Sequence, residues 1–234
     1  MPALEALGCD AVLAPMLEIV LHPPQPIALA GAQAVLVTSA NGARGLAASL
    51  APGEGRDVPV FAVGEASAAA TRALGFRRVE SAGGDVDALI ALVEQRCAPA
   101  KGWLLHAAGS VVAGDLKGRL EVKGYAVDRR VLYDARPVTR LSASLGAALR
   151  DPLTRAVLFF SPRTAETFVT LVGEAASVGR LDAVCLSEAV ARVARRLRWR
   201  RVEVAARPEQ AALMEALART LRERGQRADN VTER

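Results

Sequence analysis

The chain repeats itself once, at a distance of 122 to 123 residues, and this repeat limits the folds that it can adopt. The stretches GEASAAATRALGFRRVESA (64–82) and SEAVARVARRLRWRRVEVA (187–205) are identical at ten of nineteen positions. AVLVTSANGA (34–43) matches AVLFFSPRTA (156–165) at five of ten positions. Two blocks that recur in the same order indicate a duplication. The 234 residues suffice for two domains of roughly 100 to 120 residues, so we expect two similar domains.

Both halves of the chain alternate short apolar runs with helical segments. Runs rich in Val and Leu are typical of strands buried on both faces of a parallel sheet. The predicted strands cover 34–39, 58–64, 76–81, 102–107, 125–133, 155–161, 182–187 and 199–205. Helical spacing of Ala, Leu and Arg predicts helices at 41–50, 65–74, 85–96, 110–123, 163–173, 188–198 and 208–224, with a fraying polar tail from 224. This alternation predicts α/β domains with parallel sheets.

Composition excludes several classes of protein. Hydrophobic residues make up 51% and charged residues 24%, which is typical of a soluble globular chain. No apolar run approaches the roughly 18 to 20 residues that a membrane span needs, and the N-terminus lacks the basic region of a signal peptide. Cys9, Cys97 and Cys185 lie far apart, which favours reduced thiols in a cytoplasm. With only His22 and His106 besides, we expect no metal.

The net charge of +5 comes with arginines concentrated at 192–201 and 219–227. A nucleic-acid binder would interleave aromatic residues or show a known module, but aromatics are 4% and no module is present. Two interpretations remain: the arginines form solvated helix faces, or they attract an acidic small molecule. We expect no nucleic-acid partner.

Small residues follow four predicted strands where a helix begins. These residues are Ser39, Gly64, Ser161 and Ser187. Ligands of open α/β sheets bind at the carboxyl ends of the strands, where helix N-termini present free N–H groups. If the two carboxyl edges face each other, they form a cleft suited to carboxylates. Simple helix capping is the alternative for each residue.

Standard catalytic motifs are absent from the sequence. The chain has no GxGxxG, GxxxxGK[ST], GxSxG or HExxH, so nucleotide-binding, serine-hydrolase and zinc-protease classes lose their usual support. Glu65 and Glu188 are candidate acids, but acids in a first helical turn usually interact with the helix dipole. His106 ends a predicted strand, where a structural role is the alternative to a site.

Six segments together resemble the uroporphyrinogen-III synthase family over nearly the whole chain. They are VLVTSANGAR (35–44), VFAVGEASAAATRALGF (60–76), GDVDALIALV (84–93), KGYAVDRRVLYDA (123–135), LFFSPRTAETFV (158–169) and CLSEAVARVAR (185–195). The resemblance implies two flavodoxin-like parallel-sheet lobes joined by a two-segment extended linker. Lobe 1 would comprise 1–18 and 137–234, lobe 2 would comprise 25–131, and the linkers would be 14–24 and 131–138.

The resemblance also implies a cofactor-free lyase that dehydrates and cyclises hydroxymethylbilane, a linear tetrapyrrole with eight carboxylates. Loss of the hydroxyl gives an azafulvene cation, and ring D is inverted in the product. Tyr133 matches the family's tyrosine and would act as the general acid. The implied substrate-binding residues are Ser39, Asn41, Gly64, Ser67, Gly109, Ser161, Pro162 and Ser187. We expect a cytoplasmic monomer with at most a transient contact to the preceding pathway enzyme.

The counterpart of Ser67 in the other lobe is Val190, so a contact there would come from Ser187 or from the backbone. Two features depart from the family pattern. The chain begins within the segment expected to be the first helix, so lobe 1 should lack its first strand. Ala108 stands where an arginine often precedes the glycine. Two further alternatives therefore remain open: a two-lobed module that binds small anions without chemistry, and an inactive truncated relative.

Overall fold

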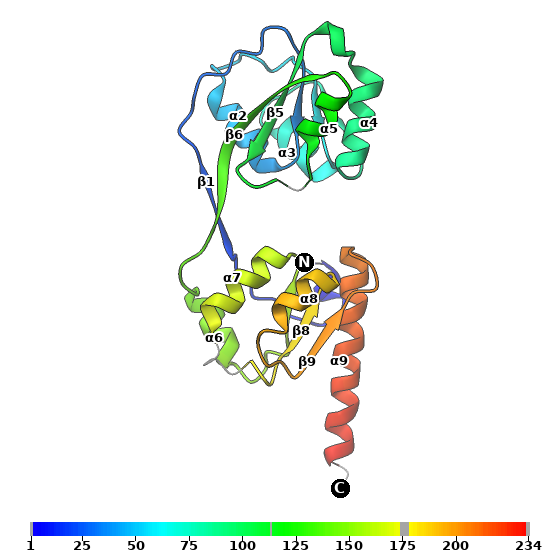
Figure 1. The fold of residues 1–234 in the computed structure, drawn as a ribbon. Coiled ribbons are helices and arrows are strands. Elements are labelled where there is room, and N and C mark those ends of the chain that lie inside the picture. Colours follow the sequence, from blue (N-terminus) through cyan, green and yellow to red (C-terminus); the bar gives the residue numbers. More distant parts are fainter. Residues whose placement is uncertain (1, 113, 174–177, 233–234) are drawn as a thin grey trace. The chain divides into compact units, whose positions relative to one another are not determined.

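The computed structural model describes residues 2–112, 114–173 and 178–232, and the chain divides into two compact units (Figure 1). Unit 1 comprises Met1–Glu18 and Pro137–Arg234, and unit 2 comprises Ile19–Arg136. Apart from the edge strand at 17–21, the strands of each unit pair in parallel, and helices separate them along the chain. The chain therefore has the α/β class with parallel sheets that the sequence predicts.

The sheet of unit 2 reverses its strand order in the middle. Its strands are β2 (Ala32–Val37), β3 (Val60–Ala62), β4 (Val79–Ser81), β5 (Trp103–Gly109) and β6 (Ala126–Pro137), and β1 (Leu17–Leu21) joins at the β6 edge. The spatial order is β1-β6-β5-β2-β3-β4. The chain proceeds from β2 to one edge and then returns to β5 on the other side of β2. In open α/β sheets, the carboxyl ends of the strands at such a reversal form the usual ligand site.

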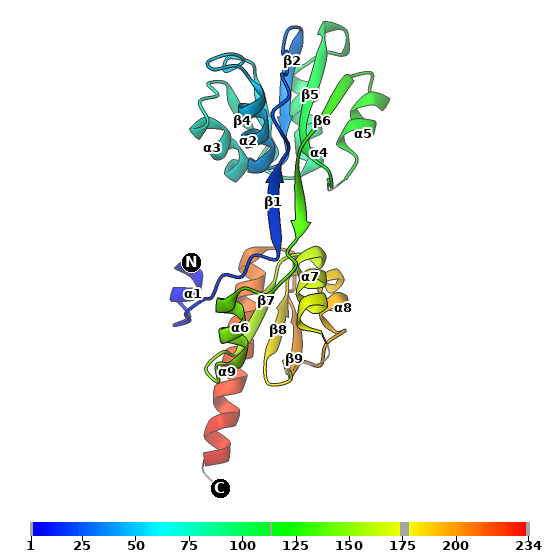
Figure 2. The same ribbon diagram turned by 90° about the vertical axis from the view of Figure 1, so that its left-hand side faces the viewer.

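Helices cover both faces of the unit 2 sheet (Figure 2). They are α2 (Ala40–Ser49), α3 (Glu65–Ala73), α4 (Val86–Arg96) and α5 (Leu116–Val122), with a short 3-10 turn η1 (Pro99–Lys101) before β5. Val35 and Val37 of β2 belong to one buried cluster and Leu36 to another. This alternation buries both faces of the strand, as its continuous apolar run predicts.

Helix α5 begins later than its sequence pattern predicts. The pattern covers 110–123, but Gly114 has a φ of +76°, which a right-handed helix does not contain. Asp115 then caps the helix by accepting from the backbone N–H of Gly118 at 2.9 Å. The prediction of a helix from 110 is therefore wrong by six residues.

Unit 1 contains a smaller sheet in the order β7-β8-β9. Its elements are α1 (Pro2–Glu5), α6 (Ala143–Arg150), β7 (Ala156–Phe159), α7 (Pro162–Val172), β8 (Asp182–Cys185), α8 (Glu188–Ala194), β9 (Arg201–Val204) and α9 (Gln210–Thr232). Helix α9 extends to Thr232, beyond the predicted helix end at 224.

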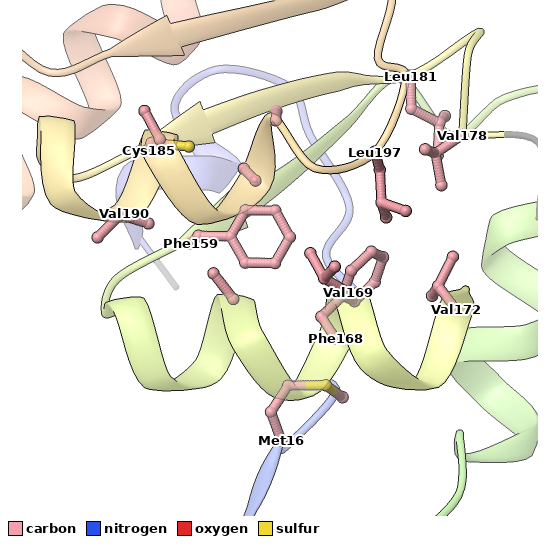
Figure 3. Close-up of a cluster of buried hydrophobic side chains, with 14 of the residues drawn as sticks. Met16, Phe159, Phe168, Val169, Val172, Val178, Leu181, Cys185, Val190 and Leu197 are labelled. Atoms are coloured by element: carbon pink, nitrogen blue, oxygen red, sulfur yellow. The ribbon is translucent and has the colours of Figure 1, made fainter. Parts of the chain in front are cut away.

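One face of the unit 1 sheet is built around aromatic rings. Phe159 of β7 and Phe168 of α7 meet edge to face, with ring centroids 5.1 Å apart, and Trp199 stacks on Phe168 at 5.9 Å. Such aromatic pairs contribute beyond the area that they bury. Figure 3 shows Phe159 and Phe168 within a cluster that also takes in Met16 from the N-terminal segment.

The N-terminal segment contributes side chains to both faces of the unit 1 sheet. Leu4 and Leu7 pack with the cluster beneath α9, whereas Ala14 and Met16 pack with the aromatic cluster on the opposite face of the sheet. The segment therefore passes from one face of the unit 1 sheet to the other.

Candidate functional site

Ser39 lies where β2 ends and α2 begins. Its extended backbone places the hydroxyl over the first turn of α2, where it accepts from the N–H of Gly42 at 3.1 Å. The same oxygen is hydrogen-bonded to the phenol oxygen of Tyr133 at 2.9 Å. The capping residue and the tyrosine singled out from the sequence thus meet at the carboxyl end of the sheet of unit 2.

A β-bulge in β6 places Tyr133 there. The β5–β6 register changes from Ala108 opposite Val131 to Gly109 opposite Tyr133, so β6 carries one extra residue, Leu132. A bulge bends its strand and redirects the side chains that follow. The bulge is held from the other side, since the N–H of His22 donates to the carbonyl of Leu132 at 2.9 Å.

Gly109 leaves the space that the Tyr133 ring occupies. A Cβ atom at position 109 would lie 2.6 Å from Cζ and 2.9 Å from the phenol oxygen of Tyr133. Real Cβ contacts are not this short, so any larger residue would displace the ring. The structure therefore places Gly109 against Tyr133.

The turn after β5 is held by three hydrogen bonds. The guanidinium Nη2 of Arg129 donates to the carbonyls of Gly109 at 2.7 Å and of Ser110 at 3.0 Å. The N–H of Ser110 donates to the carbonyl of Tyr133 at 3.0 Å. The turn and the tyrosine backbone are thereby fixed to each other.

Asp134, which follows Tyr133, is held as an anion. Interactions with the Ser110 side chain, the Arg136 guanidinium and His22 lower the pKa of Asp134 to about 2. The Arg136 Nη2 lies 2.9 Å and the His22 Nε2 lies 3.3 Å from the carboxylate. The site of unit 2 thus places the Tyr133 phenol beside a residue that carries a fixed negative charge.

The other site residues expected in unit 2 lie on the turns after β2 and β3, which are neighbouring strands. Asn41 lies in the first turn of α2, where its Oδ1 accepts from Arg44 at 2.8 Å. Gly64 is the N-cap of α3, and no side chain caps that helix among the described residues. Ser67 is buried, and its carbonyl accepts from the Thr71 hydroxyl at 2.7 Å.

The residues expected in unit 1 occupy matching turns after β7 and β8. Ser161 caps α7 by accepting from the N–H of Thr164 at 3.2 Å, and its hydroxyl is also bonded to the Thr164 hydroxyl. Pro162 is the first residue of α7, where its missing N–H costs no hydrogen bond. Ser187 is the N-cap of α8 but makes no side-chain capping bond within the described structure. The Ser161 hydroxyl is thus bonded to Thr164 of its own helix, whereas the Ser39 hydroxyl also contacts Tyr133.

The two candidate acids are paired with arginines. Glu65 receives a hydrogen bond from Arg72, and Glu188 receives one from Arg195, seven residues along in each case. The bond from Arg195 lowers the pKa of Glu188. Both carboxylates are therefore hydrogen-bonded to exposed arginines, which favours the structural alternative considered for them.

His106 is buried inside the sheet of unit 2. Its side chain is 2% exposed, and neither ring nitrogen has a hydrogen-bond partner among the described residues. Burial, with a smaller contribution from the charge of Arg129, lowers its pKa to about 4. His106 pairs in register with Leu36 on β2 and with Arg129 on β6. It is a neutral core residue at neutral pH.

Sequence reasoning did not single out four residues as parts of this site: His22, Ser110, Arg129 and Asp134. Ser110 follows Gly109 directly, and Asp134 follows Tyr133, so both could have been suspected from their place beside a predicted site residue. No feature of the sequence identifies Arg129 and His22, because only the pairing of β1, β5 and β6 brings them to the turn.

The described residues contain no group of three or more His, Cys, Asp or Glu side chains arranged to hold a metal ion. None of the helices described here combines the length and the apolar character needed to cross a membrane.

Solved structures with the same fold are uroporphyrinogen-III synthases. The enzyme from Helicobacter pylori is 18% identical, with a TM-score of 0.62 over 88% of this chain and 91% of that one. A mutant enzyme from the extremely thermophilic bacterium Thermus thermophilus is 20% identical, with a TM-score of 0.53 over 95% of this chain and 93% of that one. At these identities the likeness establishes the fold alone. No curated protein sequence matches the chain.

The family model described as uroporphyrinogen-III synthase HemD matches residues 1–215, which is most of the chain. This match agrees with the resemblance seen in the six sequence segments and with the fold of the solved structures. The chain therefore belongs to the uroporphyrinogen-III synthase family.

Proposed function

We propose that the chain is an active uroporphyrinogen-III synthase, a cofactor-free lyase that dehydrates and cyclises hydroxymethylbilane with inversion of ring D. The observation that carries this proposal is the contact between Tyr133 and Ser39 at the carboxyl ends of β2 and β5. The strand order of the sheet reverses there, which is where ligands of such sheets bind.

Tyr133 is the proposed general acid. Its phenol donates a proton to the departing hydroxyl, which leaves as water and gives the azafulvene cation. The phenolate that remains is hydrogen-bonded to Ser39 and lies at the N-terminus of α2, where the helix dipole favours negative charge. Both features stabilise the state that follows proton transfer.

The turns at the carboxyl ends of the strands are the proposed binding sites for the substrate's carboxylates. In unit 2 they carry Ser39, Asn41, Gly64 and Ser67, and in unit 1 they carry Ser161, Pro162 and Ser187. N–H groups at the start of a helix bind anions, and small residues allow the ligand to approach the backbone. The net charge of +5 attracts a polyanion.

The two units correspond to the proposed lobes, with 14–24 and 131–138 as the linkers. The division of the chain between residues 18 and 19 and between 136 and 137 supports this assignment, since both points lie within those linkers. Cys9, Cys97 and Cys185 are free thiols, which supports a reducing compartment such as the cytoplasm.

Analysis of the product isomer tests this function. Freshly prepared hydroxymethylbilane is incubated with the protein, and the uroporphyrinogen isomers are separated. Isomer I forms spontaneously, whereas isomer III requires the enzyme, so isomer III is the expected product. Isomer I alone, at the rate without protein, would identify the chain as a binding module or an inactive relative.

A further inference from the structure

The Asp134 carboxylate connects three segments of unit 2. Its partners are the His22 imidazole from the segment after β1, the Ser110 side chain from the end of β5, and the Arg136 guanidinium on β6 itself. The distances to His22 and Arg136 are 3.3 Å and 2.9 Å. One side chain thus ties together the strands that surround the bulge.

The partners of Asp134 also bind the backbone on both sides of Tyr133. The carbonyl of Tyr133 accepts from the N–H of Ser110, whose side chain interacts with the Asp134 carboxylate. On the other side, the carbonyl of Leu132 accepts from the N–H of His22, whose imidazole contacts Asp134. Ser110 and His22 therefore each bind the strand twice, once through a backbone N–H and once through the carboxylate.

The position of the phenol depends on this backbone. The bulge leaves Leu132 outside the regular β5–β6 register, so the ladder alone does not hold the strand there. A long side chain amplifies a small backbone shift at its tip, and the phenol oxygen must stay within hydrogen-bond distance of Ser39. Misplacement of a reacting group by about 1 Å can lower a rate by about a hundredfold.

Another aspartate on the same strand provides a comparison. Asp128 is bonded to Arg130 at 2.7 Å, with the same spacing as Asp134 and Arg136. Its carboxylate is more exposed than that of Asp134, at 41% against 22%. The contacts to His22 and Ser110 distinguish Asp134 from an ordinary surface pair.

We propose that Asp134 is a positioning residue, which holds Tyr133 in contact with Ser39 by tying the β5 turn and the segment after β1 to the bulge. This proposal rests on the proposed function for its kinetic consequence, but not for its structural one. Asp134 acts through the backbone of Tyr133 and does not touch the substrate.

A double-mutant cycle tests the kinetic consequence. Asp134→Asn keeps the shape of the side chain and removes its charge, so kcat for isomer III should fall about threefold to tenfold while KM changes by less than about twofold. In a Tyr133→Phe background the same change should have no further effect. Asp128→Asn should leave kcat unchanged. An equal loss of kcat in both backgrounds, a change in KM alone, or no change would overturn the proposal.

An activity-independent measurement tests the structural consequence. The chain has two tyrosines, Tyr125 and Tyr133, so NMR of ¹³C-labelled tyrosine rings identifies Tyr133 by the signal that Tyr133→Phe removes. That signal should shift or broaden in Asp134→Asn and stay in place in Asp128→Asn. An unchanged signal in Asp134→Asn would overturn the proposal. If the parent protein fails to make isomer III, the proposed function is refuted. The NMR signal of Tyr133 then still decides whether Asp134 is a positioning residue.

Discussion

The hydroxyl oxygens of Ser39 and Tyr133 lie 2.9 Å apart, although 94 residues separate them in the chain. One residue caps a helix, and the other follows a bulge on a strand two places away in the sheet. The contact therefore depends on the helix start, on the bulge and on the glycine at position 109. Each of these dependencies predicts the outcome of a substitution.

Ser39→Ala and Ser161→Ala form a matched pair. Both remove a capping hydroxyl that accepts from the third N–H after it, at 3.1 Å and 3.2 Å, so each should cost about 1 kcal/mol of stability in urea unfolding. Because only Ser39 is bonded to Tyr133, kcat should fall about threefold to tenfold in Ser39→Ala, whereas Ser161→Ala, at a proposed binding turn, should affect KM and leave kcat near the parent value. Equal kcat values in the two variants would mean that Ser39 is only a cap.

Gly109→Ala should displace the Tyr133 ring. The added Cβ would lie 2.6 Å from Cζ of Tyr133, so unfolding should show a loss of roughly 1 to 3 kcal/mol, and turnover should fall with it. In a Tyr133→Ala background the loss should largely disappear, because the clashing ring is gone. Gly64→Ala is the stability control, since its nearest contact is 4.0 Å away. If Gly109→Ala costs as much stability in the Tyr133→Ala background as in the parent, the clash is with another group.

His106 should make the protein less stable in mild acid. The pKa of the folded state, about 4, lies below the unfolded value of about 6.5, so the unfolded chain binds more protons between these pH values. Stability contributed by the neutral imidazole is thus present above pH about 6.5 and should fall by roughly 2 to 3 kcal/mol on acidification to pH about 4.5. In His106→Leu the urea midpoint should depend much less on pH in this window. If the urea midpoint depends on pH equally in the parent and in His106→Leu, His106 is not the cause.

Asp182 should be a stability determinant of unit 1. Its side chain is fully buried and is held by Arg200, whose Nε lies 2.7 Å from Oδ1, and by Arg224 at 3.4 Å. Arg200→Met removes a charged partner of this buried carboxylate and should lower the free energy of unfolding by roughly 3 to 5 kcal/mol. Arg77→Met is the control, because Arg77 pairs with Asp57 at an exposed site and should cost less than about 1 kcal/mol. Similar costs for both variants in urea unfolding would contradict this assignment.

Several features of the fold and the site follow from local sequence. Runs such as AVLV at 34–37 and VFA at 60–62 can be buried on both faces only as inner strands, and both are strands. Ser39 and Ser161 cap helices because a serine hydroxyl reaches the N–H three residues on. The pattern misplaces the start of α5 because a glycine can have either sign of φ, and only the structure shows that Gly114 has the positive one.

The rest of the site depends on long-range pairing. The bulge at Leu132 is a property of the register between β5 and β6, and neither strand encodes it alone. His22 and Asp134 meet because β1 joins the sheet beside β6, although 112 residues separate them in the chain. No periodicity predicts these contacts, so Asp134 was not among the expected site residues.

The rate of isomer III formation by Tyr133→Phe tests the central claim most directly. The substitution removes the hydroxyl that contacts Ser39, and it leaves the ring that packs against Gly109. Thermal unfolding should therefore change little, whereas kcat should fall about tenfold to a hundredfold, at the lower end of the contribution of a positioned general acid. Formation of isomer III at the parent rate by the folded variant would contradict the assignment of Tyr133 as the acid.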